Sequence, residues 1–224
     1  GCFNTCAFCV SGGEKPVRTL SIEVIRERLK EIHRHGIKNI RVLDRTFNYN
    51  NKRAKELLNL FLEFSPDICF HLEIHPALLS EELKQELAKL PKGLLHLEAG
   101  IQSLREPVLE QSRRMGRLSD ALNGLKYLCA LPNMETHADL IAGLPLYHLS
   151  EIFEDIRTLA EYGAGEIQLE SLKLLPGTEM RRRAEELGIQ YAPLPPYEVL
   201  QTREISVDEL QTARYLSRLL DGFY

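Results

Sequence analysis

The sequence predicts an α/β fold in which a parallel sheet, wound in one direction, forms a partial (β/α)6 TIM-like barrel. Short apolar segments typical of buried strands alternate with amphipathic segments of helical period. The strand-like segments recur at intervals of roughly 25 to 40 residues, which leaves room for one helix between each pair. Because each helix returns the chain to the start of the next strand, neighbouring strands are expected to be parallel.

The first expected helix follows a glycine-containing loop near the N-terminus. Ser21 is a favourable N-cap residue, and Gly36 suits the left-handed position just beyond a helix end. Apolar residues recur between them at helical spacing, namely Ile22, Ile25, Leu29 and Ile32. The pattern therefore predicts a helix that begins after Ser21 and ends before Gly36.

Strands and helices then alternate to the end of the sheet. Strands are expected over residues 37–43, 68–74, 94–99, 135–141 and 166–174. Further helices are expected over residues 51–64, 80–90, 119–131, 150–162 and 206–220. A sixth strand, the first of the barrel, is expected upstream of Gly1, because the loop that opens the sequence should follow a strand. Six βα units favour an open barrel over the closed eight-unit form, and a doubly wound sheet is the alternative.

A single domain is expected, since 224 residues suit one large α/β unit. Residues 1–190 form the expected barrel. From Gly188 onward prolines and tyrosines become frequent, so residues 191–224 are expected to form a Pro-rich connector and a C-terminal helix of the same domain. The sequence opens on Gly1 and not on Met, which indicates a piece of a longer chain.

The composition argues against two classes of partner, membranes and nucleic acid. Hydrophobic residues make up 44% of the chain and charged residues 27%, and no apolar run approaches the roughly 18 residues of a membrane span, so no membrane association is expected. A formal net charge of -4 provides no general attraction for nucleic acid, which is therefore not an expected partner. Arg181, Arg182 and Arg183 are interpreted as a solvated helix face.

Five cysteines are present, and their distribution is not that of a disulfide framework. Three of them crowd together at the N-terminus, whereas Cys69 and Cys129 stand alone in apolar segments and are interpreted as small buried residues. Free cysteines of this kind indicate a reducing compartment, so a cytoplasmic location is expected.

Cys2, Cys6 and Cys9 form a C-x3-C-x2-C motif, in which three thiolates on one short loop can bind the same iron–sulfur cluster. A [4Fe-4S] cluster commonly takes four cysteines, so three leave one iron open to another ligand. The alternatives are a zinc site completed by a histidine such as His33 or His35, and a chance group of buried thiols. No second pair of close cysteines exists downstream, which favours the cluster.

This motif, with Phe8 just before its last cysteine, resembles the defining motif of the radical S-adenosylmethionine (radical SAM) superfamily. The resemblance implies that the open iron chelates the methionyl amino and carboxylate groups of S-adenosylmethionine. Electron transfer from the reduced cluster would then break the sulfur–C5′ bond and generate a 5′-deoxyadenosyl radical. An electron donor such as flavodoxin or ferredoxin is implied as a partner, and the substrate is unknown.

Carboxylates occur at or near the ends of four expected strands, where the site of a barrel is located. These residues are Asp44, Glu73, Glu98 and Asp139. Surface or loop-capping roles are the alternative for each of them. The strand-like neighbours of Glu98 and Asp139 favour a functional role for these two residues.

Several segments resemble the superfamily branch that contains coproporphyrinogen dehydrogenase and the methylthiotransferases. In the stretch from Glu98 to Ser103, the resemblance implies that Gln102 binds the ribose, and Arg114 corresponds to an arginine that pairs with the methionyl carboxylate. Arg113 is the alternative to Arg114. The segments around Glu73 and Asp139 resemble those that contact the nucleoside, and Ile141 would pack on adenine. The second strand lacks the Gly-rich segment of this branch, so Asp44 and Thr46 are the candidates for contact with the amino group.

Pro176-Gly177-Thr178 and the segment from Pro195 to Leu200 resemble a subgroup with a cobalamin-binding domain upstream of this core. Any cobalamin would therefore be bound outside this chain, and cobalamin-dependent methyl transfer is one of the reactions implied. Methylthiolation and oxidation of a tetrapyrrole are the others. The function from a different class is a non-catalytic module, in which zinc or an iron–sulfur cluster ties down the N-terminal loop of an interaction domain.

Overall fold

The computed structural model describes residues 2–13 and 16–224. Its centre is a parallel sheet of five strands in the order β1-β2-β3-β4-β5. The strands are β1 (Asn39–Val42), β2 (Cys69–Ile74), β3 (Leu95–Gln102), β4 (Glu135–Ala142) and β5 (Glu166–Ser171). Because the spatial order follows the chain order without reversal, the sheet is wound in one direction, as a partial barrel requires and a doubly wound sheet does not. The expected α/β class is confirmed, and each of the five expected strands is present, although the ends of several differ from the expected ones.

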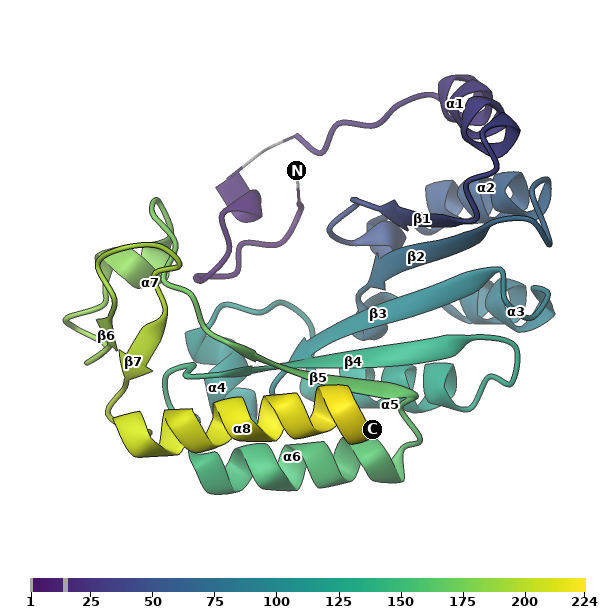
Figure 1. Cartoon of the computed structure of the whole chain (residues 1–224). Coiled ribbons are helices and arrows are strands. Elements are labelled where there is room, and N and C mark those ends of the chain that lie inside the picture. The colour runs from purple at the N-terminus through teal and green to yellow at the C-terminus, as the bar shows by residue number, and fades with distance from the viewer. Residues whose placement is uncertain (1, 14–15) are drawn as a thin grey trace.

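Helices alternate with the strands along the chain, and the last helix runs in front of the end of the sheet in this view (Figure 1). They are α1 (Ile22–Arg34), α2 (Asn51–Leu62), α3 (Glu81–Lys89), α4 (Glu106–Gln111), α5 (Leu118–Cys129), α6 (Leu149–Glu161), α7 (Glu179–Arg182) and α8 (Val207–Phe223). Ser21 caps α1 by accepting a hydrogen bond from Val24 N, and Gly36 has a φ of 71° just beyond this helix, as expected. The short helices α4 and α7 are absent from the sequence prediction.

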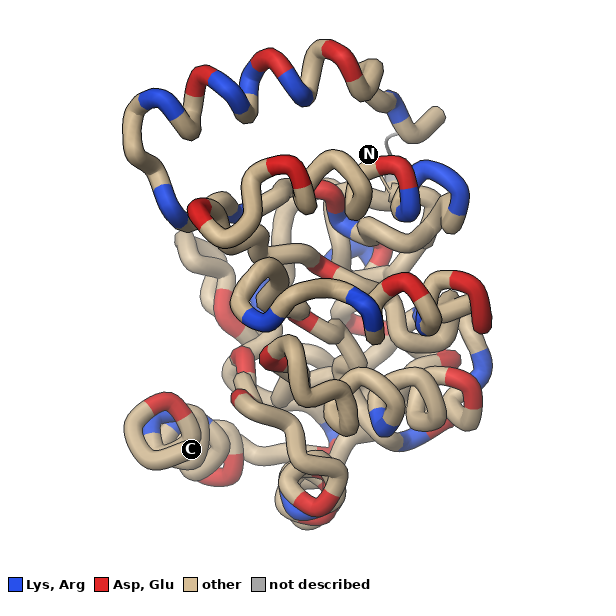
Figure 2. The backbone as a smooth tube through the Cα atoms, turned by 90° about the vertical axis from the view of Figure 1, so that its right-hand side faces the viewer, with Lys and Arg blue, Asp and Glu red and all other residues tan. Residues whose placement is uncertain are grey.

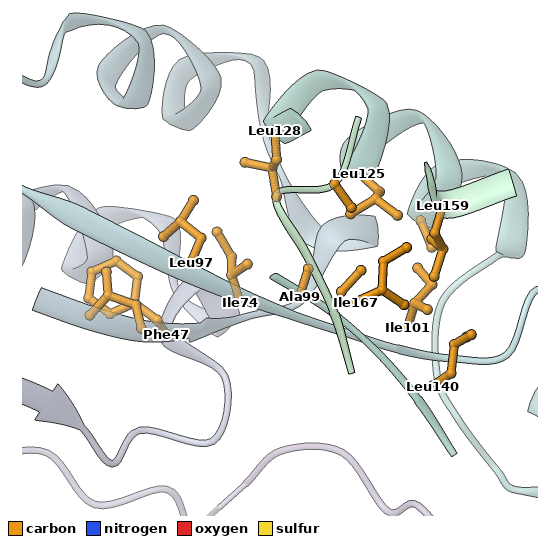
Figure 3. Packing of buried hydrophobic residues seen from close by; sticks show 14 of the residues in the cluster. Phe47, Ile74, Leu97, Ala99, Ile101, Leu125, Leu128, Leu140, Leu159 and Ile167 are labelled. Carbon is orange, nitrogen blue, oxygen red and sulfur yellow. The ribbon is translucent and has the colours of Figure 1, made fainter. Parts of the chain in front are cut away.

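The apolar core lies between the sheet and these helices. Figure 3 shows side chains of β3, among them Leu97 and Ile101, pointing toward Leu125 and Leu128 of α5 and Leu159 of α6. All five are buried, because alternate residues of a strand share one face and that face is covered by helices. Burial of this face is the main driving force for the fold.

The opposite, concave face of the sheet is polar. On β3 the side chains of His96 and Glu98 are partly exposed between the buried Leu95, Leu97 and Ala99. The same alternation occurs on β2, where His71 and Glu73 stand between buried apolar residues. A candidate site is therefore expected on this polar side of the sheet.

The segment after β5 differs from the expectation. β5 ends at Ser171 and not at residue 174, because the chain turns there and Lys173 forms an isolated antiparallel bridge with Glu198. Inside the expected connector, β6 (Gln190–Tyr191) and β7 (Val199–Gln201) form a small antiparallel sheet. α8 then runs along β5 beside α6 (Figure 1). The division of the chain at residue 190 stays a prediction.

Two interpretations of single residues are corrected. Arg182 is exposed, but Arg181 is half-buried and its guanidinium lies over the rings of Tyr191 and Tyr197, at 4.9 and 4.7 Å. The arginine run is therefore only partly solvated. Cys69 and Cys129 are free thiols that are half-buried, not fully buried.

Charged residues of both signs are interspersed along the helices, as Figure 2 shows for α1 at the top of that view. Many of them pair locally, for example Lys30 with Glu27 at 2.8 Å and Arg26 with Glu63 at 3.0 Å. Exposed pairs of this kind contribute little to stability. Among the described residues, no helix is long and apolar enough to cross a membrane.

Candidate active site

The N-terminal loop with the three cysteines lies beside the strand ends, on the same side of the molecule as α7 (Figure 1). Two backbone hydrogen bonds fix it there, because Ala7 N donates to Ser112 O at 2.9 Å and Met180 N donates to Ala7 O at 2.8 Å. A third bond, from Cys9 N to Cys6 O at 3.1 Å, makes the loop turn between two cysteines. The loop is therefore held between the segment after α4 and the start of α7.

Cys2, Cys6 and Cys9 line a single cavity of about 350 Å³ between this loop and the C-terminal ends of the strands. All three are free thiols. Burial raises the pKa of the Cys6 thiol, and the Arg114 guanidinium beside it opposes this shift. Arg114 Nη1 donates to Cys6 Sγ at 3.8 Å, so a positive charge stands where thiolates are needed for metal binding.

Eight of the twelve predicted site residues line this cavity. They are Cys2, Cys6, Phe8, Cys9, Glu73, Gln102, Arg114 and Ile141. They come from the N-terminal loop, from β2, β3 and β4, and from the segment between α4 and α5. Residues up to 139 positions apart in sequence, Cys2 and Ile141, are thus brought to one place by the parallel winding of the chain.

Gln102 occupies an unusual backbone position at the end of β3. Its φ is 69°, and the register between β3 and β4 shifts between Gly100 and Gln102. Left-handed conformations of non-glycine residues are costly and cluster at functional sites. The side-chain Oε1 atom of Gln102 is buried and has no hydrogen-bond partner among the described residues, so it is free to accept a hydrogen bond from a ligand.

Arg114 is held in place by contacts on two sides. Its Nη2 donates to Gly100 O on β3. The loop that carries it is anchored by His75, whose Nε2 donates to Met115 O at 3.0 Å. His75 is in turn fixed by Asn48, which exchanges two hydrogen bonds with the His75 backbone at 2.9 and 2.8 Å. Burial lowers the pKa of His75 to about 3, so the ring is neutral near pH 7.

Arg113, the alternative to Arg114, points elsewhere. Its side chain is exposed and pairs with Glu179 of α7 at 2.6 Å. It does not line the cavity, whereas Arg114 does. The geometry therefore favours Arg114 over Arg113 as the arginine of the site.

Asp44 and Thr46 lie next to this cavity, in a small separate pocket that also includes Cys2. Thr46 Oγ1 stands 3.7 Å from Cys2 Sγ and donates to Arg45 O at 2.6 Å. These two residues flank the cysteine loop from outside the main cavity.

Glu98 and Asp139 lie deeper on the concave face and do not line the cavity. Glu98 accepts a hydrogen bond from His71 Nε2 at 2.9 Å and pairs with Arg41 at 3.3 Å. Asp139 Oδ1 is 3.0 Å from His137 Nε2. Burial raises the pKa of Asp139, and its His137 neighbour opposes the shift.

Among the lining residues that the sequence analysis did not predict, four are polar and follow strands, namely Arg45, Glu170, Ser171 and Lys173. Arg45 pairs with Glu73 at 3.1 Å, and burial raises the pKa of this carboxyl while the Arg45 charge opposes the shift. These four could have been predicted in the same way as the strand-end carboxylates, because all four lie at the C-terminal end of a strand or just beyond it.

The zinc alternative with a histidine of the first helix is wrong for this structure. His33 and His35 lie at the C-terminal end of α1, where they pair with Asp67 at 2.9 Å and Glu31 at 3.0 Å. Neither lines the cavity of the cysteines. The three thiols, an adjacent guanidinium and an unpartnered amide oxygen fit an iron–sulfur cluster that keeps one iron open to a polar ligand.

Comparison with known proteins gives the family. The sequence pattern of the radical SAM superfamily matches residues 1–165, and the chain therefore belongs to this superfamily of enzymes, which use a [4Fe-4S] cluster and S-adenosylmethionine. Residues 185–224 match a second family, described as a protein of unknown function (DUF4080).

Curated relatives include methylthiotransferases. A tRNA-2-methylthio-N(6)-dimethylallyladenosine synthase of Herpetosiphon aurantiacus is 25% identical over 94% of this chain, which covers 49% of that protein. The ribosomal protein uS12 methylthiotransferase RimO of Clostridium acetobutylicum is 25% identical over 65% of this chain and 35% of its own length. The chain thus spans about half the length of such relatives or less.

Solved structures share the fold. The radical SAM methyltransferase TsrM from Kitasatospora setae aligns with a TM-score of 0.72 and 18% identity, over 87% of this chain and 40% of that one. Coproporphyrinogen III oxidase (HemN) from Escherichia coli aligns with a TM-score of 0.62 and 17% identity, over 97% of this chain and 50% of that one. The expected superfamily and branch are confirmed.

Proposed function

We propose that this chain binds a [4Fe-4S] cluster through Cys2, Cys6 and Cys9 and cleaves S-adenosylmethionine reductively beside it. The observation that carries the proposal is the cavity in which these three free cysteines meet Gln102 and Arg114. When bound, the reduced cluster and S-adenosylmethionine supply a 5′-deoxyadenosyl radical for hydrogen abstraction from a substrate. The roles of the chain are to bind, to orient and to exclude water.

Arg114 is the residue we assign to the methionyl carboxylate. A guanidinium has five N–H donors in a fixed plane, and the contacts with Gly100 O and Cys6 Sγ use only part of them. These contacts also fix the orientation of the plane before a ligand arrives. The remaining donors suit a carboxylate, which accepts two parallel hydrogen bonds.

Gln102 and Ile141 are the residues we assign to the nucleoside. A ribose hydroxyl would donate to Gln102 Oε1, which is buried and otherwise unpartnered among the described residues. Ile141 presents a half-buried apolar side chain to the same cavity and suits the face of adenine. Glu73 would complete the polar wall around the nucleoside, with Glu98 and Asp139 below this wall and outside the cavity. Asp44 and Thr46, in the adjoining pocket that shares Cys2 with the cavity, are the residues we assign to the amino group. Phe8 would cover the cluster.

The reaction class we propose is methyl transfer to an unidentified substrate, assisted by cobalamin bound outside this chain. A structure of TsrM, a methyltransferase of the same fold, is described with cobalamin and a [4Fe-4S] cluster. Methylthiolation is the competing reaction, supported by the names of the curated relatives. An electron donor such as flavodoxin or ferredoxin would reduce the cluster, and the free cysteines support a cytoplasmic location.

The test is formation of 5′-deoxyadenosine by the anaerobic protein after reconstitution with iron and sulfide and addition of dithionite and S-adenosylmethionine. Wild-type chain is expected to form it, Cys6→Ala to form none, and Cys129→Ala to match the wild type. Arg114→Lys should raise the KM for S-adenosylmethionine by roughly 10-fold or more, since hydrogen bonds to a charged group contribute about 1.5–3 kcal/mol. Arg113→Lys is the matched control.

Colourless protein that contains zinc, forms no 5′-deoxyadenosine and is indifferent to Cys6→Ala would contradict the proposal. That outcome would favour the non-catalytic metal-binding module. Cobalamin dependence is tested separately, by comparing methyl transfer with and without cobalamin in the longer protein.

A further inference from the structure

A second group of metal-ligating side chains lies on the concave face, away from the cysteines. His96, His137 and Glu166 come from the neighbouring strands β3, β4 and β5, and each lies near the N-terminal end of its strand. Each offers one ligand atom, and these three atoms lie within 4.8 Å of one another. Strand register explains the grouping, because His96 pairs with Glu135 and His137 pairs with Glu166.

His137 is the most buried member of the group, with 5% of its surface exposed. Its Nδ1 atom is 3.8 Å from Glu166 Oε1, and its Nε2 atom is 3.0 Å from Asp139 Oδ1. Neither Nε2 nor Asp139 Oδ1 has a well-aligned hydrogen bond to a described residue. The Nε2 side of this imidazole thus faces Asp139 closely, whereas its Nδ1 atom lies beyond hydrogen-bond distance from Glu166 and is available to another partner.

His96, on the neighbouring strand, also has a ring nitrogen that is available to another partner. Its Nε2 atom is buried without a hydrogen-bond partner in the described part of the chain, while its Nδ1 atom faces the exposed Glu135 at 3.7 Å. The rings of His96 and His137 meet edge to face, with centroids 6.1 Å apart. Two imidazole nitrogens, Nε2 of His96 and Nδ1 of His137, therefore converge with the Glu166 carboxylate on one region between the three strands.

We infer that His96, His137 and Glu166 form a binding site for a divalent first-row transition-metal ion. Imidazole and carboxylate ligands suit such ions, zinc among them, at metal–ligand distances of about 2.0–2.2 Å. The contacts assign Nδ1 of His137 and Nε2 of His96 as ligands. The Glu166 side chain is 53% exposed, so it is free to move toward the ion, and the same exposure gives the ion a path from solvent.

The groups around the proposed ligands are placed to orient them. A metal-bound histidine usually donates its other ring N–H to a carboxylate, which fixes the ring and strengthens the ligand. With Nδ1 of His137 on the metal, Nε2–H would point at Asp139 Oδ1, 3.0 Å away. His71 stacks on His96 at 4.4 Å, but its Nε2 is bonded to Glu98, so His71 supports the site without being a ligand.

This site is distinct from the cysteine cavity. His96 and Gln102 are six residues apart on β3, which at about 3.3 Å per residue corresponds to roughly 20 Å. Three protein ligands leave at least one coordination position for water or a substrate group. The ion would thus lie at the bottom of the same polar face, below the site proposed for S-adenosylmethionine.

Zinc binding tests the inference directly, with the three thiols of the motif removed from the measurement. The variant with Cys2→Ser, Cys6→Ser and Cys9→Ser is dialysed to equilibrium against Zn²⁺, and bound zinc is quantified; the reconstituted wild-type chain is measured in parallel. One zinc ion per chain is expected in this triple-serine variant, which keeps Cys69 and Cys129. Adding His96→Ala, His137→Ala or Glu166→Gln should weaken binding by more than about 100-fold, beyond the loss of roughly 10- to 100-fold that follows when a residue that only orients a ligand is changed.

His33→Ala is the matched control, because it removes an imidazole that pairs with a carboxylate on the surface. It should leave zinc affinity unchanged. Glu166→Gln alters an exposed side chain and keeps the test valid if a histidine variant melts early by circular dichroism. Absence of saturable zinc in the triple-serine variant, or unchanged affinity after any one of the three ligand substitutions, would overturn the site.

Discussion

On β3, Leu97 and Glu98 are neighbours in the chain but belong to opposite faces of the sheet. Leu97 is fully buried against the helices, as is Leu72, the residue of β2 that pairs with it. Glu98 faces the concave side, where His71 and Arg41 contact it. The covered face is almost entirely apolar, whereas the concave face carries histidines, carboxylates and arginines.

Alternate residues of the same strands therefore have different roles. Those on the covered face stabilise the fold, and those on the concave face are available for chemistry. Apolar burial on the covered face offsets the conformational entropy of the chain. The polar residues of the concave face contribute little to that burial, and several of them are held in unfavourable states, such as the buried carboxyl of Asp139 with its raised pKa. Substitutions on the two faces should therefore have separable effects.

The largest expected effect comes from the covered face. Leu97→Ala should lower the free energy of unfolding by about 4 kcal/mol, since the residue is fully buried and leaves a cavity. Glu98→Gln, the adjacent change on the concave face, should alter it by less than about 1 kcal/mol. Urea unfolding of both variants measures the difference. Equal destabilisation by the two variants would contradict the different roles of the two faces.

A second large effect is expected from the buried carboxylate of Asp155, which lies behind the sheet. Asp155 of α6 is 1% exposed and accepts hydrogen bonds from Tyr147 Oη at 2.6 Å, Leu104 N at 2.8 Å and Arg105 Nε at 2.9 Å. Asp155→Ala would leave these donors unsatisfied and should cost about 3 kcal/mol in thermal or urea unfolding. Asp120→Ala, which breaks only an exposed pair with Arg117, should cost less than about 1 kcal/mol.

A smaller effect, about 2 kcal/mol when the pH falls from 6.5 to 5, is expected from His75. Its ring stays neutral in the folded state down to about pH 3, whereas the unfolded ring takes up a proton below its ordinary value of 6.5. The unfolded state therefore binds more protons between these values, and His75 makes stability fall with decreasing pH, by up to about 1.4 kcal/mol per unit. His75→Asn should flatten the pH profile of unfolding across this window. A profile as steep as the wild type would contradict the assignment.

The smallest effect on stability is expected from Gly12→Ala, which should instead change how much iron the cysteine loop binds. A Cβ atom at Gly12 would lie 2.7 Å from Asn4 O inside the cysteine loop, so Gly12→Ala forces that loop to shift. Melting temperature should be unchanged, while iron bound per chain after reconstitution should fall. Gly222→Ala, where an added Cβ meets nothing within 4 Å, is the control for both measurements.

The division between the faces also explains what sequence could predict. Apolar alternation marked the five strands and the main helices, and the cysteine spacing marked the loop. Glu98 was expected at a strand end because the strand was expected to stop at residue 99. In the structure β3 continues to Gln102, so Glu98 lies in mid-strand, below the cavity.

The remaining features depend on tertiary contacts that local sequence does not encode. The positive φ of Gln102 arises where β3 shifts register against β4. α4 and α7 are too short for a periodic signal, at six and four residues. The grouping of His96, His137 and Glu166 follows from strand register, which becomes visible only once the strands are paired.

The central claim is that three cysteines hold a [4Fe-4S] cluster whose fourth iron is open to S-adenosylmethionine. Electron paramagnetic resonance of the reduced, reconstituted chain tests it most directly. The spectrum should change when S-adenosylmethionine is added, and Arg114→Lys should require more S-adenosylmethionine for the same change while Arg113→Lys should not. A cluster signal that is unaffected by S-adenosylmethionine, or that persists in Cys6→Ala, would contradict the account.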